Sequence, residues 1–292
     1  MLITIKGFIK IIFQSIAIFL LLLIFLFFID AVFVMLGMII SGNPASPVKF
    51  FIERFYPLIA AIILMLWSKR KRPGIYKSIN SALSLNKVSR KKFFTYFGTS
   101  LAILFSSFLL SVLMGYSIFK HLGNTIYSNS TIIEFYISVW LCGNVLVAIG
   151  EEIIFRGFLI NYITGISKSR LYSLLFVSLV FSTHHYPDFL NYAIAFLAGL
   201  ATGYAYLKYK SLYPSIGIHL AYNIFNATIA SESTNGPQLP YLIKFKYLRI
   251  AEGIGDYAEL FIILGMLMIL TFLYLYNNGA FKNQYFLLRS RH

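Results

Sequence analysis

The stretch VAIGEEIIFRGFL, residues 147–159, places two carboxylates and one guanidinium inside an apolar run. Ionised side chains are costly in hydrocarbon, so within a spanning segment they usually face a bundle interior or a wet cavity and mark function. On an α-helix Glu152 and Arg156 are spaced i, i+4 and can pair. Glu151 lies about 100° further round the helix. Glu151 is therefore predicted to point elsewhere and to remain available for chemistry.

The composition of the whole chain is that of an integral membrane protein. Of the 292 residues, 59% are hydrophobic and 12% are charged. A soluble domain could not cover itself with so little polar surface, so the lipid bilayer is a predicted partner. The formal charge of +15 could suggest nucleic acid, but the basic residues sit between apolar runs and form no nucleic-acid-reading module. No nucleic-acid partner is predicted, and the single cysteine, Cys142, excludes an intrachain disulfide.

Eight apolar stretches approach the roughly 20 residues that a helix needs to cross a bilayer. The first is about twice the length of a signal-peptide core and has no small-residue cleavage site, so it is predicted to be retained. We therefore predict an all-α, polytopic membrane protein with about eight transmembrane helices. The stretches are 11–38, 50–67, 94–117, 132–160, 171–186, 191–207, 214–230 and 256–276.

The chain is predicted to contain three segments. Residues 1–130 hold N-terminal transmembrane helices and a basic cytoplasmic loop at 68–92. Residues 131–231 hold helices four to seven, which carry the intramembrane polar residues. Residues 232–292 hold an outer loop, the last transmembrane helix and a cytoplasmic tail.

The lysines and arginines orient the chain, since cytoplasmic segments of membrane proteins are rich in them. With both termini inside, 18 of the 25 Lys and Arg residues fall in cytoplasmic segments, and nine of these lie in 68–92. None of the Asp or Glu residues falls there. We therefore predict a multi-pass protein of a bacterial-type cell membrane with both termini in the cytoplasm.

Two further polar clusters interrupt apolar helices. FSTHHYPDF, residues 181–189, contains His184 and His185 at the end of the fifth predicted span. SIGIHLAYNIFN, residues 215–226, places His219 and Asn223 one turn apart on one helical face. A lone buried histidine is more often a packed core residue, but three clusters on neighbouring helices can converge on one cavity. Glu, His and Asn side chains together can activate a water and stabilise an oxyanion.

These clusters resemble the motifs of the CPBP family, which includes CAAX prenyl protease type 2 and the bacteriocin-processing or immunity proteins also called Abi. The motifs are Glu-Glu-x-x-x-Arg at 151–156, Phe-x-x-x-His at 181–185 and His-x-x-x-Asn at 219–223. Each motif alone is weak, but their order on hydrophobic helices is specific. The resemblance covers about residues 131–230, and His184 matches no motif position.

The resemblance implies a helical intramembrane endopeptidase with a CPBP-type core of helices four to seven. Glu151 and His185 would activate the attacking water. His219 and Asn223 would hold the tetrahedral oxyanion. Two matched positions would support the site, namely Glu152 and Arg156. The implied partner is a peptide or protein substrate in the membrane, and the sequence does not say whether that substrate is prenylated.

Metal dependence is left open by the sequence. Glu151, His185 and His219 could supply three zinc ligands with water at the fourth position. None of the motifs is the His-Glu-x-x-His of the zincins, so spacing does not establish zinc. Direct catalysis by glutamate and histidine is slightly favoured, and so is a site that opens toward the cytoplasm.

Two other classes of protein remain as alternatives. A non-proteolytic immunity or scaffold protein could keep the same helical core, and a transporter could use buried Glu and His as a proton relay. Inverted repeats are not evident, which disfavours a transporter. A scaffold has no need for both His185 and the His219–Asn223 pair. The sequence therefore favours the protease.

Overall fold

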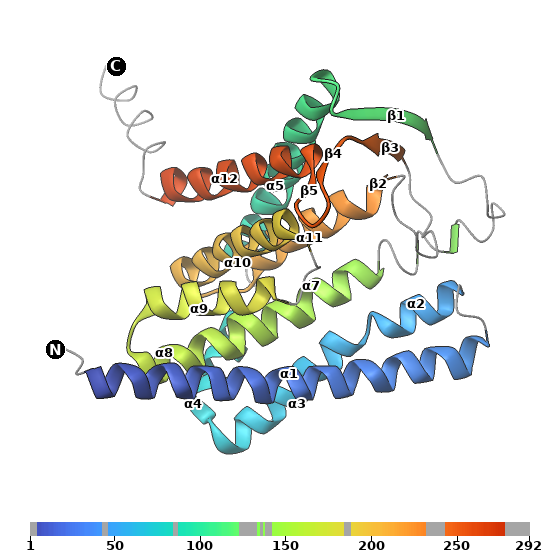
Figure 1. The fold of residues 1–292 in the computed structure, drawn as a ribbon. Helices are drawn as coiled ribbons and strands as arrows, with labels where there is room; N and C mark the ends of the chain where they lie inside the picture. Colours follow the sequence, from blue (N-terminus) through green and yellow to red (C-terminus); the bar gives the residue numbers. More distant parts are fainter. Residues whose placement is uncertain are drawn as a thin grey trace, which may run out of the picture.

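The computed structural model describes residues 5–42, 46–83, 87–122, 133–134, 137, 142–183, 188–231 and 243–277. The described chain is dominated by helices that lie alongside one another (Figure 1). Helix α1 runs from the N-terminal side of the molecule to the side that carries the strands. The predicted all-α polytopic fold is confirmed.

Helices occupy the described parts of all eight predicted spanning stretches. Five helices among the described residues are long and apolar enough to cross a membrane, by length and composition. The number of membrane passes remains a prediction. The helices are α1 (Ile5–Ser41), α2 (Pro47–Glu53), α3 (Tyr56–Lys71), α4 (Pro73–Ala82), α5 (Lys87–Leu113), α7 (Asn144–Glu152), α8 (Asn161–Ser167), α9 (Arg170–Ser182), α10 (Phe189–Tyr209), α11 (Tyr213–Thr228) and α12 (Tyr257–Asn277).

Local sequence explains several helix ends. The side chains of Ser169 and Asp188 accept hydrogen bonds from the first-turn amides of α9 and α10, as N-cap residues do. Pro214 lies in the first turn of α11, where its missing N–H removes no helical hydrogen bond. Lys168 and Lys210 adopt left-handed conformations that end α8 and α10.

The helix that carries the charged stretch changes its winding within that stretch. Between α7 and α8 lies η2 (Ile153–Ile160), a π-helical segment with i to i+5 hydrogen bonding. π-Helical turns are rare and are frequent at functional sites. The sequence predicts an α-helix here, and the wider winding begins directly after Glu152, so the two glutamates sit at the junction.

Five short strands among the described residues, at one end of the molecule, were not predicted. β3 (Ile243–Tyr247) lies between β1 (Ser117–Leu122) and β2 (Ile229–Ser231), antiparallel to the first and parallel to the second. β4 (Arg249–Ala251) and β5 (Gly255–Asp256) form a separate hairpin. This hairpin accepts backbone hydrogen bonds from Phe189 and Leu190 at the start of α10. The strands therefore tie the ends of α5, α10 and α11 together on the side away from the N-terminus (Figure 1).

The helices pack into two adjoining apolar cores. One surrounds η2 with side chains from α1, α3, α4, α9 and α11, and the other joins α5, α10, α11 and α12. On α10, a Cβ added at Gly199 would lie 2.9 Å from Ser178 Cα, and one at Gly203 would meet the Leu174 side chain. Small residues here permit the close approach of α9.

Candidate functional site

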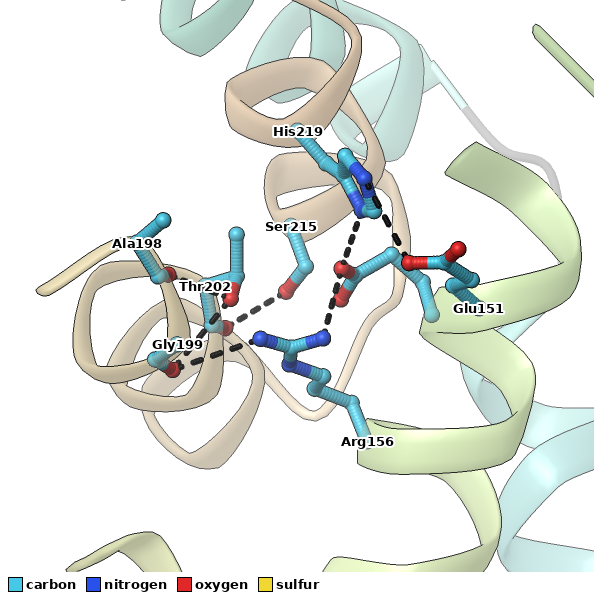
Figure 2. Close-up of polar contacts among 8 residues, drawn as sticks. Glu151, Arg156, Ala198, Gly199, Thr202, Ser215 and His219 are labelled. Atoms are coloured by element: carbon cyan, nitrogen blue, oxygen red, sulfur yellow. Dashed lines mark hydrogen bonds and ion pairs between the residues drawn. The ribbon is translucent and has the colours of Figure 1, made fainter. Parts of the chain in front are cut away.

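Glu152 is the centre of a buried polar network. Its Oε1 lies 2.9 Å from Arg156 Nη1 in the predicted i, i+4 ion pair and 2.8 Å from His219 Nδ1 on α11. The Glu152 and Arg156 side chains are 0% and 1% exposed. Figure 2 shows His219 reaching from α11 toward Glu151 on α7. The predicted ion pair is therefore extended by a histidine that lies 67 residues away in the chain.

Arg156 is held on its other side by α9 and α10. Its Nη2 lies 3.5 Å from the carbonyl oxygen of Gly199, to which it donates, and its guanidinium lies 4.5 Å from the centre of the Phe181 ring. Both contacts suit a buried cation, since a carbonyl oxygen and the face of an aromatic ring carry negative potential. Arg156 thus joins the helix that carries the glutamates to α9 and α10.

The Ser215 hydroxyl holds α11 against α10 at the level of this network, while the Thr202 hydroxyl bonds within α10. Ser215 Oγ donates to the carbonyl oxygen of Thr202 at 2.7 Å, and Thr202 Oγ1 donates to the carbonyl oxygen of Ala198 at 2.7 Å (Figure 2). Ser215 is one turn before His219. This contact therefore fixes the depth at which the histidine meets the glutamates.

Glu151 occupies a different position from Glu152, as its place on the helix predicts. Its Oε2 lies 3.7 Å from His219 Nε2, which is longer than a direct hydrogen bond. This buried Oε2 accepts no hydrogen bond from the described part of the chain. The Glu151 side chain is 13% exposed and lines a cavity.

The cavity has a volume of about 360 Å³ and is lined by α7, α9, α10, α11, α12 and the residue that follows α2. Glu151, His219 and Asn223 all line it, so three of the four predicted catalytic residues meet in one place. Glu152 and Arg156 lie buried beside it. The fourth predicted residue, His185, and its neighbour His184 lie outside the described residues. The catalytic and supporting roles of these side chains remain predictions.

Several cavity-lining residues were missed by the sequence analysis. Asn144 precedes Glu151 by two helical turns, and Asn191 begins the row that Ala195 and Ala198 continue on α10. The helical spacing of 144, 147 and 151 is visible in the sequence and could have placed Asn144 on the glutamate's face. Nothing in the sequence associates Arg54, between α2 and α3, with this cavity.

The cavity lies in particular halves of its helices. It is lined by α7, which begins the continuous α7–η2–α8 helix, by positions 191–202 of α10 and by positions 218–227 of α11. The basic segments follow or precede the opposite ends of these helices. The orientation of the termini and the opening of the site toward the cytoplasm both remain predictions.

No group of three or more His, Cys, Asp or Glu side chains that could hold a metal occurs within the described ranges. The zinc set suggested by the motifs includes His185, which those ranges omit. Glu151 Oε2 and His219 Nε2 lie 3.7 Å apart. A tetrahedral zinc with ligand bonds of about 2.0–2.2 Å places two donors about 3.4 Å apart. The separation of Glu151 Oε2 and His219 Nε2 therefore fits a zinc ion. Zinc binding remains a prediction.

Comparison with known families identifies the segment that carries the motifs. Residues 133–225 match the family described as type II CAAX prenyl endopeptidase Rce1-like. The match covers α7 to α11 and includes all three motifs, in agreement with the resemblance read from the sequence. Searches of curated proteins and of solved structures each found no match.

Proposed function

We propose that this membrane protein, whose residues 133–225 match the Rce1-like CAAX prenyl endopeptidase family, is an intramembrane endopeptidase that hydrolyses a peptide bond of a membrane-associated or prenylated peptide or protein. The observation that carries the proposal is the convergence of Glu151, His219 and Asn223 on one cavity from two helices. These are the residue types that water activation and oxyanion stabilisation need.

Glu151 is the proposed general base. Its carboxylate takes a proton from a water molecule as the water oxygen adds to the substrate carbonyl carbon. The resulting tetrahedral intermediate collapses, the C–N bond breaks, and the same proton passes to the leaving amine. His185, assigned from its motif, would share the activation of the water. Glu151 lines the cavity in which such a water would lie.

His219 and Asn223 are the proposed oxyanion donors. In the neutral tautomer that donates from Nδ1 to Glu152, His219 Nε2 carries a lone pair. In the protonated ring both nitrogens donate, and Nε2–H is then available to the oxyanion. The oxyanion role therefore requires a protonated His219, whose charge the Glu152 carboxylate compensates at 2.8 Å. Asn223 supplies a neutral amide donor one turn further along α11.

A zinc-dependent variant uses the same side chains in another way. Glu151 and His219, with His185, would hold the ion, which would lower the pKa of a bound water and polarise the substrate carbonyl. Glu152 would then orient the His219 ring from outside the metal site, as carboxylates commonly do for zinc-bound histidines. Chelation distinguishes this variant from direct catalysis.

A scaffold or immunity protein is the runner-up. The network of Glu152, Arg156 and His219 links α7, η2, α10 and α11, and that link alone is a structural reason for three buried polar groups. It gives no reason for Glu151 and Asn223, which face the cavity. The proposal therefore depends on these two residues.

The test uses purified protein in detergent with a library of membrane peptides, prenylated and unprenylated, with and without chelator. Glu151→Gln should keep the fold and abolish cleavage, because an amide cannot take a proton from water. Glu252→Gln, at an exposed position on the β4–β5 hairpin, is the matched control and should cleave normally. Cleavage by Glu151→Gln at the wild-type rate would exclude the proposed base. Absence of any cleavage by the wild type would favour the scaffold.

A further inference from the structure

A second cavity, separate from the candidate active site, lies where α3, α4 and α8 meet. It has a volume of about 380 Å³. One wall is formed by the end of α3 and the start of α4, at positions 71–75, and the other by one face of α8, at positions 161–166. Lys71 and Arg72 both line it, and we therefore call it the basic cavity.

The positive charge of the basic cavity is not neutralised by any described carboxylate. The Arg72 guanidinium lies 5.4 Å from the centre of the Tyr162 ring, and neither Arg72 nor Lys71 forms an ion pair with a described Asp or Glu. No Asp or Glu occurs in residues 54–133 or 153–187, which include every segment that lines this cavity. Basic pockets between transmembrane helices bind the headgroups of anionic lipids. The charge of the basic cavity thus favours an anionic ligand.

An apolar groove begins one helical turn away from the basic cavity. It has a volume of about 290 Å³ and is lined by apolar side chains of α1, α3 and η2. On α3, Trp67 of the groove precedes Lys71 of the basic cavity by four residues, or about 6 Å along the helix axis. On the opposite wall, Phe158 of the groove precedes Tyr162 of the basic cavity by the same number of residues. The groove and the basic cavity therefore follow each other along the same two walls.

A row of aromatic rings joins the apolar groove to the basic cavity. The ring centres of Trp67 and Phe158 lie 5.9 Å apart, and those of Phe158 and Tyr162 lie 5.8 Å apart. Tyr162 in turn carries the Arg72 guanidinium on its ring. Trp and Tyr are typical of the level in a membrane where headgroups meet acyl chains. The wall thus passes from apolar through aromatic to basic, as a phospholipid passes from acyl chain to headgroup.

We propose that the basic cavity and the apolar groove form one binding site for an anionic phospholipid. The phosphate of the headgroup lies between Lys71 and Arg72, and one acyl chain lies in the groove against Trp67 and Phe158. The lining segments contain no acidic side chain that could hold the ammonium of a zwitterionic headgroup, so the anionic class is preferred. The site does not depend on the proposed endopeptidase function, because its lining shares no residue with the cavity of Glu151.

Native mass spectrometry of the full chain in detergent tests the headgroup, with phosphatidylglycerol and phosphatidylcholine of identical acyl chains as probes. The wild type should bind phosphatidylglycerol more tightly. Lys71→Gln combined with Arg72→Gln should weaken that binding roughly 30-fold, because two cations near the phosphate are lost. Lys69→Gln combined with Arg70→Gln is the matched control, since it removes the same charge from exposed positions of α3 outside the cavity. Equal affinity of the wild type for the two lipids, or an equal loss in both double variants, would overturn the proposal.

Ile63→Trp tests the apolar groove. Ile63 is exposed and lines the groove, so a tryptophan there takes the space of the acyl chain. Both lipids should then bind about tenfold more weakly, because the burial of about two CH₂ groups is lost. Ile62→Trp, at the exposed neighbouring position outside the groove, is the matched control and should bind both lipids as the wild type does. The same affinity in the two variants would show that no chain lies in the groove, which contradicts a lipid site.

Inorganic phosphate distinguishes a lipid site from a site for the free anion. It should fail to displace phosphatidylglycerol at millimolar concentration, since it cannot occupy the groove. Displacement at that concentration would identify a phosphate site only and would overturn the lipid assignment.

Gly165→Phe blocks the basic cavity without changing its charge, and it serves even if the double variant at Lys71 and Arg72 does not fold. A Cβ at Gly165 would meet no atom within 4 Å, so the larger side chain enters open space. This variant should unfold in lipid-free detergent at the wild-type temperature and should bind phosphatidylglycerol more weakly than the wild type. Binding at the wild-type affinity would exclude the headgroup from the cavity.

Discussion

His219 Nδ1 lies 2.8 Å from Glu152 Oε1, so the third-motif histidine is bound by the glutamate that also pairs with Arg156. The second glutamate of the first motif therefore has two partners on two helices. Glu151, one residue earlier, faces the same histidine from the cavity side at 3.7 Å. The two adjacent carboxylates thus face opposite nitrogens of one imidazole ring, which agrees with the proposed division into a holding and a reactive carboxylate.

Removal of the Glu152 carboxylate should lower the stability of the protein. Glu152→Ala leaves the buried Arg156 cation without its anion and His219 without its partner, and breaking a buried ion pair in this way costs about 3–5 kcal/mol. Glu151→Gln removes no such partner. Thermal unfolding in detergent should therefore begin at a clearly lower temperature for Glu152→Ala than for Glu151→Gln. Equal unfolding temperatures would contradict the division of roles between the two glutamates.

The oxyanion assignment predicts a shared kinetic effect for His219 and Asn223. Loss of one preorganised donor lowers turnover by about 100- to 1,000-fold while substrate affinity is nearly kept. Asn223→Ala and His219→Ala should both show this drop in kcat with similar KM and unchanged metal content. Steady-state kinetics and elemental analysis measure the two quantities. A stoichiometric zinc that disappears with His219→Ala and persists with Asn223→Ala would instead support the zinc-dependent variant.

Arg54 predicts a preference for substrates with a free carboxylate. Among the described residues that line the cavity, it is the one Lys or Arg, and it shares the cavity with Glu151. A hydrogen bond to a charged group contributes about 1.5–3 kcal/mol, or roughly tenfold and more in binding. Arg54→Gln should therefore raise KM about tenfold for peptides that end in a carboxylate. It should leave KM unchanged for the same peptides with an amidated C-terminus. Lys246→Gln, an exposed position on β3 outside the cavity, should change neither.

The close approach of α3 and α7 predicts a stability difference between two glycines. A Cβ at Gly150 would collide with the backbone of Pro57 and Leu58, whereas one at Gly165 would meet no atom within 4 Å. Gly150→Ala should destabilise the protein by about 1–3 kcal/mol, as overpacking does. Gly165→Ala should be neutral or stabilising, because alanine favours helix more than glycine does. Unfolding in detergent measures the stability of the two variants. A similar loss of stability in both would argue against the packing of α3 on α7.

The sequence by itself determined the class of the fold and the identity of most candidate site residues. Apolar runs of spanning length leave a chain no alternative to helices, because the bilayer offers no partner for exposed backbone groups. Helical spacing predicted the Glu152–Arg156 pair correctly, since residues four apart share a face whatever surrounds the helix.

Only the tertiary structure decided which residues meet between helices. The contact of His219 with Glu152 joins residues 67 positions apart, and Arg54 reaches the cavity from outside the motif-bearing segment, so neither has a local signal. The strands escaped prediction because β3 is short and pairs with segments distant in the chain. The position of the cavity along the bundle also depended on the packing of α10 against α11 through Thr202 and Ser215, which no periodicity in either helix specifies. Helix periodicity assigns a face to each residue, but the depth at which two faces meet is set by their packing.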